Sequence, residues 1–81
     1  MVYVYVIRSR AGGRRYVGIT GDVRRRLEEH NAGRSASTRA GRPWELAYEE
    51  AYESHEEARR REKYLKSSAG RRYLKRVLGE E

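Results

Sequence analysis

The sequence contains no cysteine, no phenylalanine and a single proline. Without cysteine there is no disulfide, no thiol nucleophile and no cysteine-ligated zinc site. The longest uninterrupted apolar run covers residues 2–7, far fewer than the ~20 that a membrane-spanning helix needs. That run follows Met1 directly, without a basic leader or a small-residue cleavage site, so no signal peptide is expected. These absences favour a soluble, cytoplasmic protein with no membrane partner.

The length of the chain, 81 residues, predicts one domain that spans residues 1–81 and lies close to the lower size limit for a single hydrophobic core. Apolar residues make up 37% of the chain and charged residues 38%, whereas an average globular domain has about 45–50% and about 25%. Disordered chains share this bias. Here the apolar residues are patterned rather than scattered, so a folded domain is predicted.

Positive charge is concentrated in the first half of the chain. The formal net charge is +7; residues 1–44 contain ten basic and three acidic residues, whereas residues 45–81 contain nine of each. A localised surplus is typical of a protein that contacts a phosphate-rich partner. Codon bias in a GC-rich genome explains why most of these residues are arginine, but it does not explain the uneven distribution. We therefore expect a nucleic-acid partner.

Hydrophobic periodicity predicts two strands, a helix and a third strand in the first two thirds of the chain. Residues 2–8 are apolar on both faces, which is typical of a central, covered strand. A glycine-containing turn joins them to a second strand over residues 14–19 in a β-hairpin. A helix capped by Thr20 or Asp22 runs to about residue 31. The third strand covers residues 44–52, where Trp44, Leu46 and Tyr48 alternate with polar neighbours as if on one face.

Two further helices follow. Ser54 and Glu57 form a capping-box signature, and the helix that they open runs to about residue 66. Residues 67–70 interrupt it, and a last helix covers residues 71–78. The order ββαβαα predicts an α+β fold, in which helices flank a three-stranded antiparallel sheet.

One carboxylate interrupts an apolar helix face. Glu62 comes four residues after Ala58 and three before Leu65, so helical geometry places it among them on the inward stripe. A buried carboxylate is costly unless it is paired or binds a metal. The sequence leaves two interpretations of Glu62 equally open: a metal ligand, or a structural ion pair with one of the many arginines.

Arg26 and His30 form a second polar pair beside an apolar face. They are spaced i, i+4 and are therefore neighbours on one helix face. An arginine and a histidine at one place suit an anionic substrate and a proton shuttle. A histidine in such a position is more often structural, and both interpretations remain open.

Tyrosine is unusually frequent, with seven residues. Tyr3 and Tyr5 lie on the first predicted strand and Tyr16 on its hairpin partner. Phenols can act as general bases when nearby cations lower their pKa, although tyrosine also suits a half-buried sheet for structural reasons. Gly18, just after Tyr16, indicates the close approach of a ligand or another backbone.

These residues, in this order and over nearly the whole chain, resemble the GIY-YIG endonuclease superfamily. The first triplet of that family corresponds to Tyr3-Val4-Tyr5, and the second to Tyr16-Val17-Gly18. The arginine helix of the family resembles the segment that contains Thr20, Arg26-Leu27 and His30-Asn31. The short stand-alone bacterial branch is matched by Arg42-Pro43-Trp44, Leu46, Tyr48, Ala58, Arg61-Glu62 and Leu65-Lys66.

The resemblance implies a nuclease that cuts one phosphodiester strand with one divalent metal ion, Mg²⁺ or Mn²⁺. By this resemblance Glu62 holds the metal, and Arg26 binds the scissile phosphate and stabilises its developing charge. Family members differ in which tyrosine activates the attacking water, so Tyr5 and Tyr16 both remain candidates. His30 can take the proton from that tyrosine.

The expected contacts to the substrate are Tyr3, Gly18, Arg24, Arg25 and Arg39. The sequence departs from the family pattern in two ways. Tyr3 stands where the family usually has glycine, and no asparagine occurs after Asn31, although several larger members use an asparagine in the last helix. Lys75 or Arg76 occupies that late region.

The expected substrate is DNA, cut with little sequence specificity because phosphate contacts position a protein without reading bases. A preference for flaps, branches or single strands, a role in repair or recombination, and a protein partner that supplies targeting fit this resemblance. Two alternatives remain: a catalytically inactive nucleic-acid-binding module, and a protein-interaction domain with incidental charge.

Overall fold

The computed structural model describes residues 1–79 and has seven elements. In chain order they are β1 (Val2–Ser9), β2 (Arg15–Thr20), α1 (Val23–Asn31), the short 3₁₀ helix η1 (Arg39–Gly41), β3 (Trp44–Tyr52), α2 (His55–Leu65) and α3 (Ser68–Leu78). The strands form one antiparallel sheet in the order β2-β1-β3. The predicted α+β fold and the order ββαβαα are confirmed.

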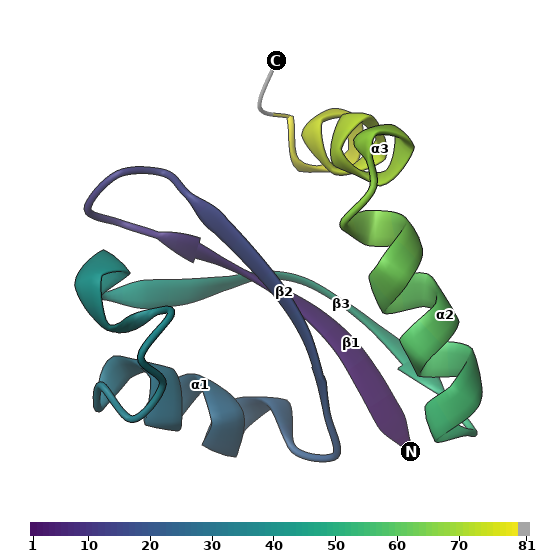
Figure 1. Cartoon of the computed structure of the whole chain (residues 1–81), viewed down its shortest axis with the longest axis horizontal. Coiled ribbons are helices and arrows are strands. Elements are labelled where there is room, and N and C mark those ends of the chain that lie inside the picture. Colours follow the sequence, from purple (N-terminus) through teal and green to yellow (C-terminus); the bar gives the residue numbers. More distant parts are fainter. Residues whose placement is uncertain (80–81) are drawn as a thin grey trace.

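The central strand β1 is covered on both faces, as its two apolar faces predict. Its even-numbered valines pack beneath α2 and α3, with Val17, Ala58, Leu65 and Leu74. Its odd-numbered Tyr5 and Ile7 pack with Trp44 and with apolar residues of α1. Figure 1 looks onto β2, with α1 on one side of the sheet and α2 on the other. In the sheet order β2-β1-β3, β2 is an edge strand, and the two helices lie on opposite faces of the sheet beside it.

A β-bulge in β3 contradicts the predicted alternation of that strand. Val6 pairs with Tyr48 but Ile7 pairs with Leu46, so Ala47 is the extra residue. A bulge shifts all later side chains to the other face. Trp44 accordingly packs on the α1 side, whereas Tyr48 packs on the α2 side. The expectation that Trp44, Leu46 and Tyr48 share one face is wrong.

Short polar side chains begin all three α-helices. Asp22, and not Thr20, caps α1: its Oδ1 accepts the backbone N–H of Arg25 at 3.1 Å. Ser54 caps α2 as predicted, with its hydroxyl 3.1 Å from the backbone nitrogen of Glu57. Each cap satisfies one of the unpaired N–H groups of the first turn.

Helix α3 begins three residues earlier than predicted. Ser67 caps it, with its hydroxyl 3.2 Å from the backbone nitrogen of Gly70. Gly70 is therefore helical, and its lack of a side chain lets α3 approach α2 closely: a Cβ there would lie 2.0 Å from the carbonyl oxygen of Tyr64 and 2.4 Å from the Cα of Leu65. The predicted break at residues 67–70 is the tight junction between two helices.

We expect Gly70→Ala to lower the free energy of unfolding by about 2–3 kcal/mol, near the upper end of overpacking costs. Alanine is the better helix former, but its methyl group would collide with the backbone of α2. Urea denaturation followed by circular dichroism measures the change. Gly12→Ala is the matched control, because a Cβ at Gly12 meets nothing within 4 Å. A Gly70→Ala protein as stable as the wild type would contradict the tight junction.

No helix within residues 1–79 is both long enough and apolar enough to span a bilayer.

Candidate active site

The Tyr5 phenol lies over Gly18, its pairing partner on the edge strand β2. A Cβ at residue 18 would lie 2.7 Å from the Tyr5 hydroxyl and 2.8 Å from its ring carbon Cζ. Glycine therefore leaves the space that this ring occupies, and any side chain would displace it. The sequence indicated the close approach of a ligand or another backbone at Gly18, but the group that lies there is the side chain of Tyr5 on the neighbouring strand.

A hydrogen-bonded chain runs from Tyr5 through His30 to the loop before β3. The Tyr5 hydroxyl lies 2.8 Å from His30 Nε2, and His30 Nδ1 lies 2.8 Å from the Thr38 hydroxyl. Thr38 in turn donates to the carbonyl oxygen of Ser35 at 3.4 Å. Because the hydroxyl proton of Thr38 points to the Ser35 carbonyl oxygen, the Thr38 oxygen accepts a hydrogen bond from the Nδ1–H of His30. The Nε2 lone pair of His30 then accepts the Tyr5 proton.

The Thr38 loop is itself held in place by the start of β3. The carbonyl oxygen of the fully buried Thr38 accepts the Trp44 indole N–H at 2.7 Å. The Asn31 side chain makes two hydrogen bonds to the backbone of Trp44, at 2.7 Å and 3.0 Å. Sequence reasoning missed Thr38, because no periodic pattern marks a hydroxyl residue within an irregular loop. Thr38 nevertheless orients the histidine.

Burial sets the protonation of both groups in this pair. It raises the pKa of Tyr5 to about 12, against the opposing effect of a hydrogen bond from Arg26. Burial also lowers the pKa of His30, and the positive charge of Arg26 lowers it further. Near neutral pH the tyrosine is therefore a protonated donor and the histidine a neutral acceptor, which is the arrangement a proton relay needs.

We expect the stability of the protein to fall as the pH falls below about 6.5, the ordinary pKa of histidine. The folded-state pKa of His30 is depressed, so the unfolded chain binds more protons in this range. The stability that a neutral His30 contributes is present above about pH 6.5 and is lost as the pH falls through the folded-state pKa. Melting temperatures measured from pH 7.5 to pH 5 test this.

His30→Gln removes this pH-dependent contribution and should flatten the decline, whereas the exposed His55→Gln should leave it unchanged. Equal declines in the wild type and in His30→Gln would contradict the assignment.

Arg26 is held against Tyr5 by an acidic neighbour on its own helix. Its Nη1 lies 2.9 Å from Glu29 Oε1, and it also donates to the Tyr5 hydroxyl. The hydrogen bond with Glu29 raises the pKa of Arg26. The Arg26 side chain keeps 32% of its surface exposed, so a guanidinium with five donors can still reach an anion in solvent. Glu29 is a positioning residue that the sequence did not single out.

Tyr16 lies beside the same histidine but faces a different environment. Its ring meets His30 edge-on, with centroids 5.1 Å apart, and lies 6.4 Å from the Tyr5 ring. Tyr16 is half-buried and lines a cleft together with Lys66. Tyr5, with 1% of its surface exposed, is instead enclosed. The two candidate tyrosines therefore differ in access to solvent.

Glu62 lies on α2, on the opposite face of the sheet from α1. Its side chain is 15% exposed, and Oε2 lies 3.1 Å from Lys66 Nζ. Burial is the main cause of the raised pKa of Tyr5, and the negative charge of Glu62 adds a smaller contribution in the same direction. The cation paired with Glu62 is a lysine, not one of the arginines considered from the sequence.

The donor set at Glu62 fits a metal ion that keeps most of its waters. Within the described part of the chain no three His, Asp or Glu side chains gather as a metal cage. Mg²⁺ commonly binds through one or two carboxylates, with waters and substrate phosphate oxygens completing its shell. The half-buried carboxylate of Glu62 can supply the one protein ligand of such an ion.

Four of the expected substrate contacts lie apart from the cluster. Tyr3 and Arg24 line a hollow at the start of α1. Arg25 lines another hollow and lies 3.5 Å from Glu29. The Arg39 Nε donates to the carbonyl oxygen of Gly33 at 3.0 Å, so this side chain stabilises the loop between α1 and β3. The structure thus brings together Tyr5, Tyr16, Arg26, His30 and Gly18, and leaves these four outside. Glu62 is linked to this group through Lys66, which lines the same cleft as Tyr16.

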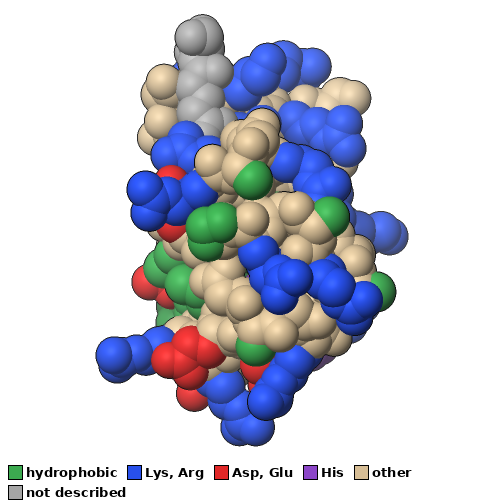
Figure 2. Space-filling view, turned by 90° about the vertical axis from the view of Figure 1, so that its left-hand side faces the viewer, with side chains coloured by type: hydrophobic (Ala, Val, Ile, Leu, Met, Phe, Trp, Pro, Cys, Tyr) green, Lys and Arg blue, Asp and Glu red, His purple; other side chains and the backbone are tan. Residues whose placement is uncertain are grey.

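Basic side chains are spread over one whole side of the molecule. Figure 2 shows Lys and Arg side chains from the top to the bottom of this face, with the fewer acidic side chains toward its left and lower part. A surface with this distribution attracts a polyanion before any specific contact forms.

Comparison with known proteins identifies the family to which the chain is similar. The model of the GIY-YIG catalytic domain family matches residues 1–74. A UPF0213 protein of Streptococcus agalactiae is 46% identical over 65 residues, which are 79% of this chain and 73% of the relative. One of Staphylococcus aureus is 36% identical over 76 residues, covering 93% of this chain and 92% of the relative. The solution NMR structure of a UPF0213 protein from Bacillus halodurans is similar, with a TM-score of 0.57 and 36% identity over 99% of this chain and 88% of that one.

Proposed function

The chain belongs to the GIY-YIG family, and from that premise we propose that it is a metal-dependent endonuclease that hydrolyses phosphodiester bonds of DNA at the free edge of β2. The observation that carries the proposal is the position of the Tyr5 hydroxyl. It lies 2.8 Å from His30 Nε2, and Arg26, on the same helix as His30, donates to it. Tyr16, which packs against His30, lines a cleft together with Lys66, the partner of Glu62. We infer that the phenol, the guanidinium and the carboxylate serve one site there.

Arg26 is the group that would bind the scissile phosphate. Its guanidinium is partly exposed, and Glu29 fixes its direction. Charge builds up on the phosphate oxygens in the transition state, and a pre-oriented guanidinium stabilises it without reorganisation.

Tyr5 and His30 would carry the proton away from the attacking water. The water oxygen forms the new bond to phosphorus as its proton passes to the Tyr5 oxygen, and the Tyr5 proton passes to His30 Nε2, 2.8 Å away. The bond to the leaving oxygen breaks, and solvent protonates that oxygen. Thr38 accepts the Nδ1–H of His30 and so keeps Nε2 free of a proton beforehand.

Glu62 would hold the metal ion, Mg²⁺ or Mn²⁺, which supplies neutralisation of the phosphate charge when bound. Lys66 pairs with the same carboxylate. An i,i+4 pair whose lysine is half exposed is worth less than about 1 kcal/mol, so it does not prevent exchange of the ammonium for a divalent cation.

The expected substrate range follows from the contacts that the chain offers. The site cluster presents groups for phosphate, and phosphate contacts carry no sequence information. We infer little sequence specificity, selection by structure such as flaps, branches or single strands, and a role in DNA repair or recombination.

Tyr5→Phe should lower the cleavage rate by about 10²–10⁴-fold, the range of general acid–base effects, with little change in KM. Tyr16→Phe should cost about tenfold or less, because Tyr16 lines the cleft and Tyr5 is the tyrosine that bonds to His30 Nε2. Single-turnover rates on a labelled flap substrate measure both. The reverse ranking would assign the relay to Tyr16.

A cleavage panel tests the function itself. Supercoiled plasmid, linear duplex, flap, branched and single-stranded DNA are incubated with Mg²⁺, with Mn²⁺ or with EDTA. We expect metal-dependent nicking, fastest on substrates with unpaired strands. Binding that weakens steeply with salt, without cleavage in either metal, would instead identify an inactive binding module.

A further inference from the structure

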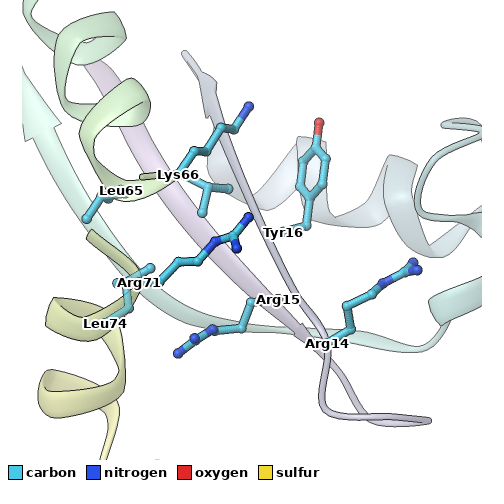
Figure 3. Close-up of a pocket in the computed structure, with 8 residues that line it drawn as sticks. Arg14, Arg15, Tyr16, Leu65, Lys66, Arg71 and Leu74 are labelled. Carbon is cyan, nitrogen blue, oxygen red and sulfur yellow. The ribbon is translucent and has the colours of Figure 1, made fainter. Parts of the chain in front are cut away.

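A cationic cleft lies next to the site cluster, between β2 and the corner where α2 meets α3. Its volume is about 460 Å³, within the range of about 300–1,000 Å³ typical of sites for small organic ligands. Four cations line it: Arg14 just before β2, Arg15 at the start of β2, Lys66 at the end of α2 and Arg71 on α3. Figure 3 shows Arg71 extending toward β2 and Arg15 extending toward α3.

The floor of this cleft is aliphatic. Val17, Leu65 and Leu74 line it, and their side chains belong to the core beneath α2 and α3. None of the described residues that line the cleft is acidic. The cleft therefore combines an apolar base with a cationic rim, which suits a ligand that is flat and apolar at one end and anionic at the other.

The cleft is continuous with the proposed catalytic site. Tyr16 lines it and also packs against His30. Lys66 lines it and also bonds to Glu62. A strand whose phosphate is bound by Arg26 would therefore pass Tyr16 and bring its next nucleotide to the mouth of this cleft.

We propose that the cleft binds an unpaired nucleotide of the DNA strand, next to the phosphate that is cut; this rests on the proposed function and names its substrate class. The base would lie on the aliphatic floor near the Tyr16 ring, and its phosphate would contact Arg71 and Lys66. In a duplex the bases are stacked and paired, so only the convex backbone could approach and the floor would stay uncovered. An unstacked base can enter such a hollow.

Binding measured in EDTA tests the proposal without cleavage. Fluorescence anisotropy gives the affinity of each protein for a short single-stranded oligonucleotide, for the same backbone made of abasic nucleotides, and for a hairpin duplex with equal phosphate number. Arg71→Ala removes a cleft cation. Arg72→Ala, an exposed neighbour on the same helix that does not line the cleft, is the matched control, and circular dichroism verifies folding.

We expect Arg71→Ala to weaken single-strand binding about tenfold, as for loss of one charge-assisted contact, and to lower the salt slope by about 0.7. Arg72→Ala should change the affinity for single-stranded DNA by less than about twofold. The affinity for the duplex should change equally in both variants. The wild type should bind the abasic oligonucleotide at least about fivefold more weakly than the intact one.

Equal losses from Arg71→Ala and Arg72→Ala on single strands, or equal affinity for intact and abasic oligonucleotides, would overturn the proposal. These outcomes are separate from a failure of the proposed function. That failure would appear as absence of cleavage when metal is added to the wild type, with the binding differences unchanged.

Discussion

The Glu62→Gln protein is expected to remain folded but to cleave DNA at least about 10³-fold more slowly than the wild type. A bound metal contributes several kcal/mol to stabilisation of the transition-state charge, and about 4 kcal/mol corresponds to this factor. Glutamine keeps the shape of the side chain but removes the charge that would hold the cation. The pairing lost with Lys66 spans four residues on a helix and is worth about 0.3–0.5 kcal/mol.

The matched control is Glu56→Gln, which removes the same charge from an exposed position on the same helix. Nicking of supercoiled plasmid over a range of Mg²⁺ concentrations measures both variants, with thermal melting as the folding control. Undiminished nicking by Glu62→Gln would rule out Glu62 as the metal ligand.

The second large effect is expected at Glu50, which joins β3 to α2. Both of its carboxylate oxygens accept from Arg61, at 3.0 Å and 3.1 Å, and the hydroxyls of Tyr48 and Tyr52 donate to the same group. The Arg61 guanidinium also lies over the Tyr73 ring, 4.9 Å from its centre. This network fixes α2 on the sheet directly beside Glu62.

Glu50→Ala should lower the free energy of unfolding by about 2–4 kcal/mol, somewhat less than the ~3–5 kcal/mol for breaking a fully buried pair, because Arg61 is 28% exposed. The variant leaves a half-buried guanidinium and two phenols without their acceptor. In a domain of this size that loss is a large fraction of the total stability. Urea denaturation measures it.

Glu49→Gln, which removes a charge from the exposed neighbouring position, should change stability by less than about 0.5 kcal/mol. Burial acts to raise the pKa of Glu50, but hydrogen bonds from Arg61 and the tyrosines outweigh it and the pKa is lowered. The stability that Glu50 adds is therefore present above about pH 4.5 and is lost as the pH falls through the lowered value. Equal stability of Glu50→Ala and Glu49→Gln would contradict this function of the network.

Most of the fold was predictable from the periodicity of the apolar residues. A strand with apolar residues on both faces must be central, and β1 is. The features that the sequence did not reveal depend on contacts between distant segments. The bulge at Ala47 is defined by the pairing of β3 with β1, where Val6 pairs with Tyr48 and Ile7 with Leu46, and this pairing is not visible in the sequence of β3 alone. Gly70, which locally resembles a helix break, instead admits the backbone of α2.

The sequence singled out Glu62 and His30 because each is a polar residue that interrupts an apolar pattern. The structure shows His30 bonded to Tyr5, and metal binding by Glu62 stays a prediction. The candidate site was not predictable where an irregular loop supplies the partner, as Thr38 does for His30. The sequence also could not distinguish the two candidate tyrosines, because Tyr5 and Tyr16 each lie on a predicted strand of the same hairpin. Only their positions on a central and an edge strand make one enclosed and the other a wall of the cleft.

The central claim is that Glu62, Tyr5 and Arg26 serve one metal-dependent site at the free edge of β2. Adding Mn²⁺ in substoichiometric amounts to ¹⁵N-labelled protein tests it directly, because a bound paramagnetic ion broadens the amide signals nearest to it. We predict that the amide signal of Glu62 weakens first, together with that of Gly18 across the sheet edge, and that Glu62→Gln abolishes the effect. Broadening centred on Glu28 and Glu29 of α1, or unchanged by Glu62→Gln, would contradict the account.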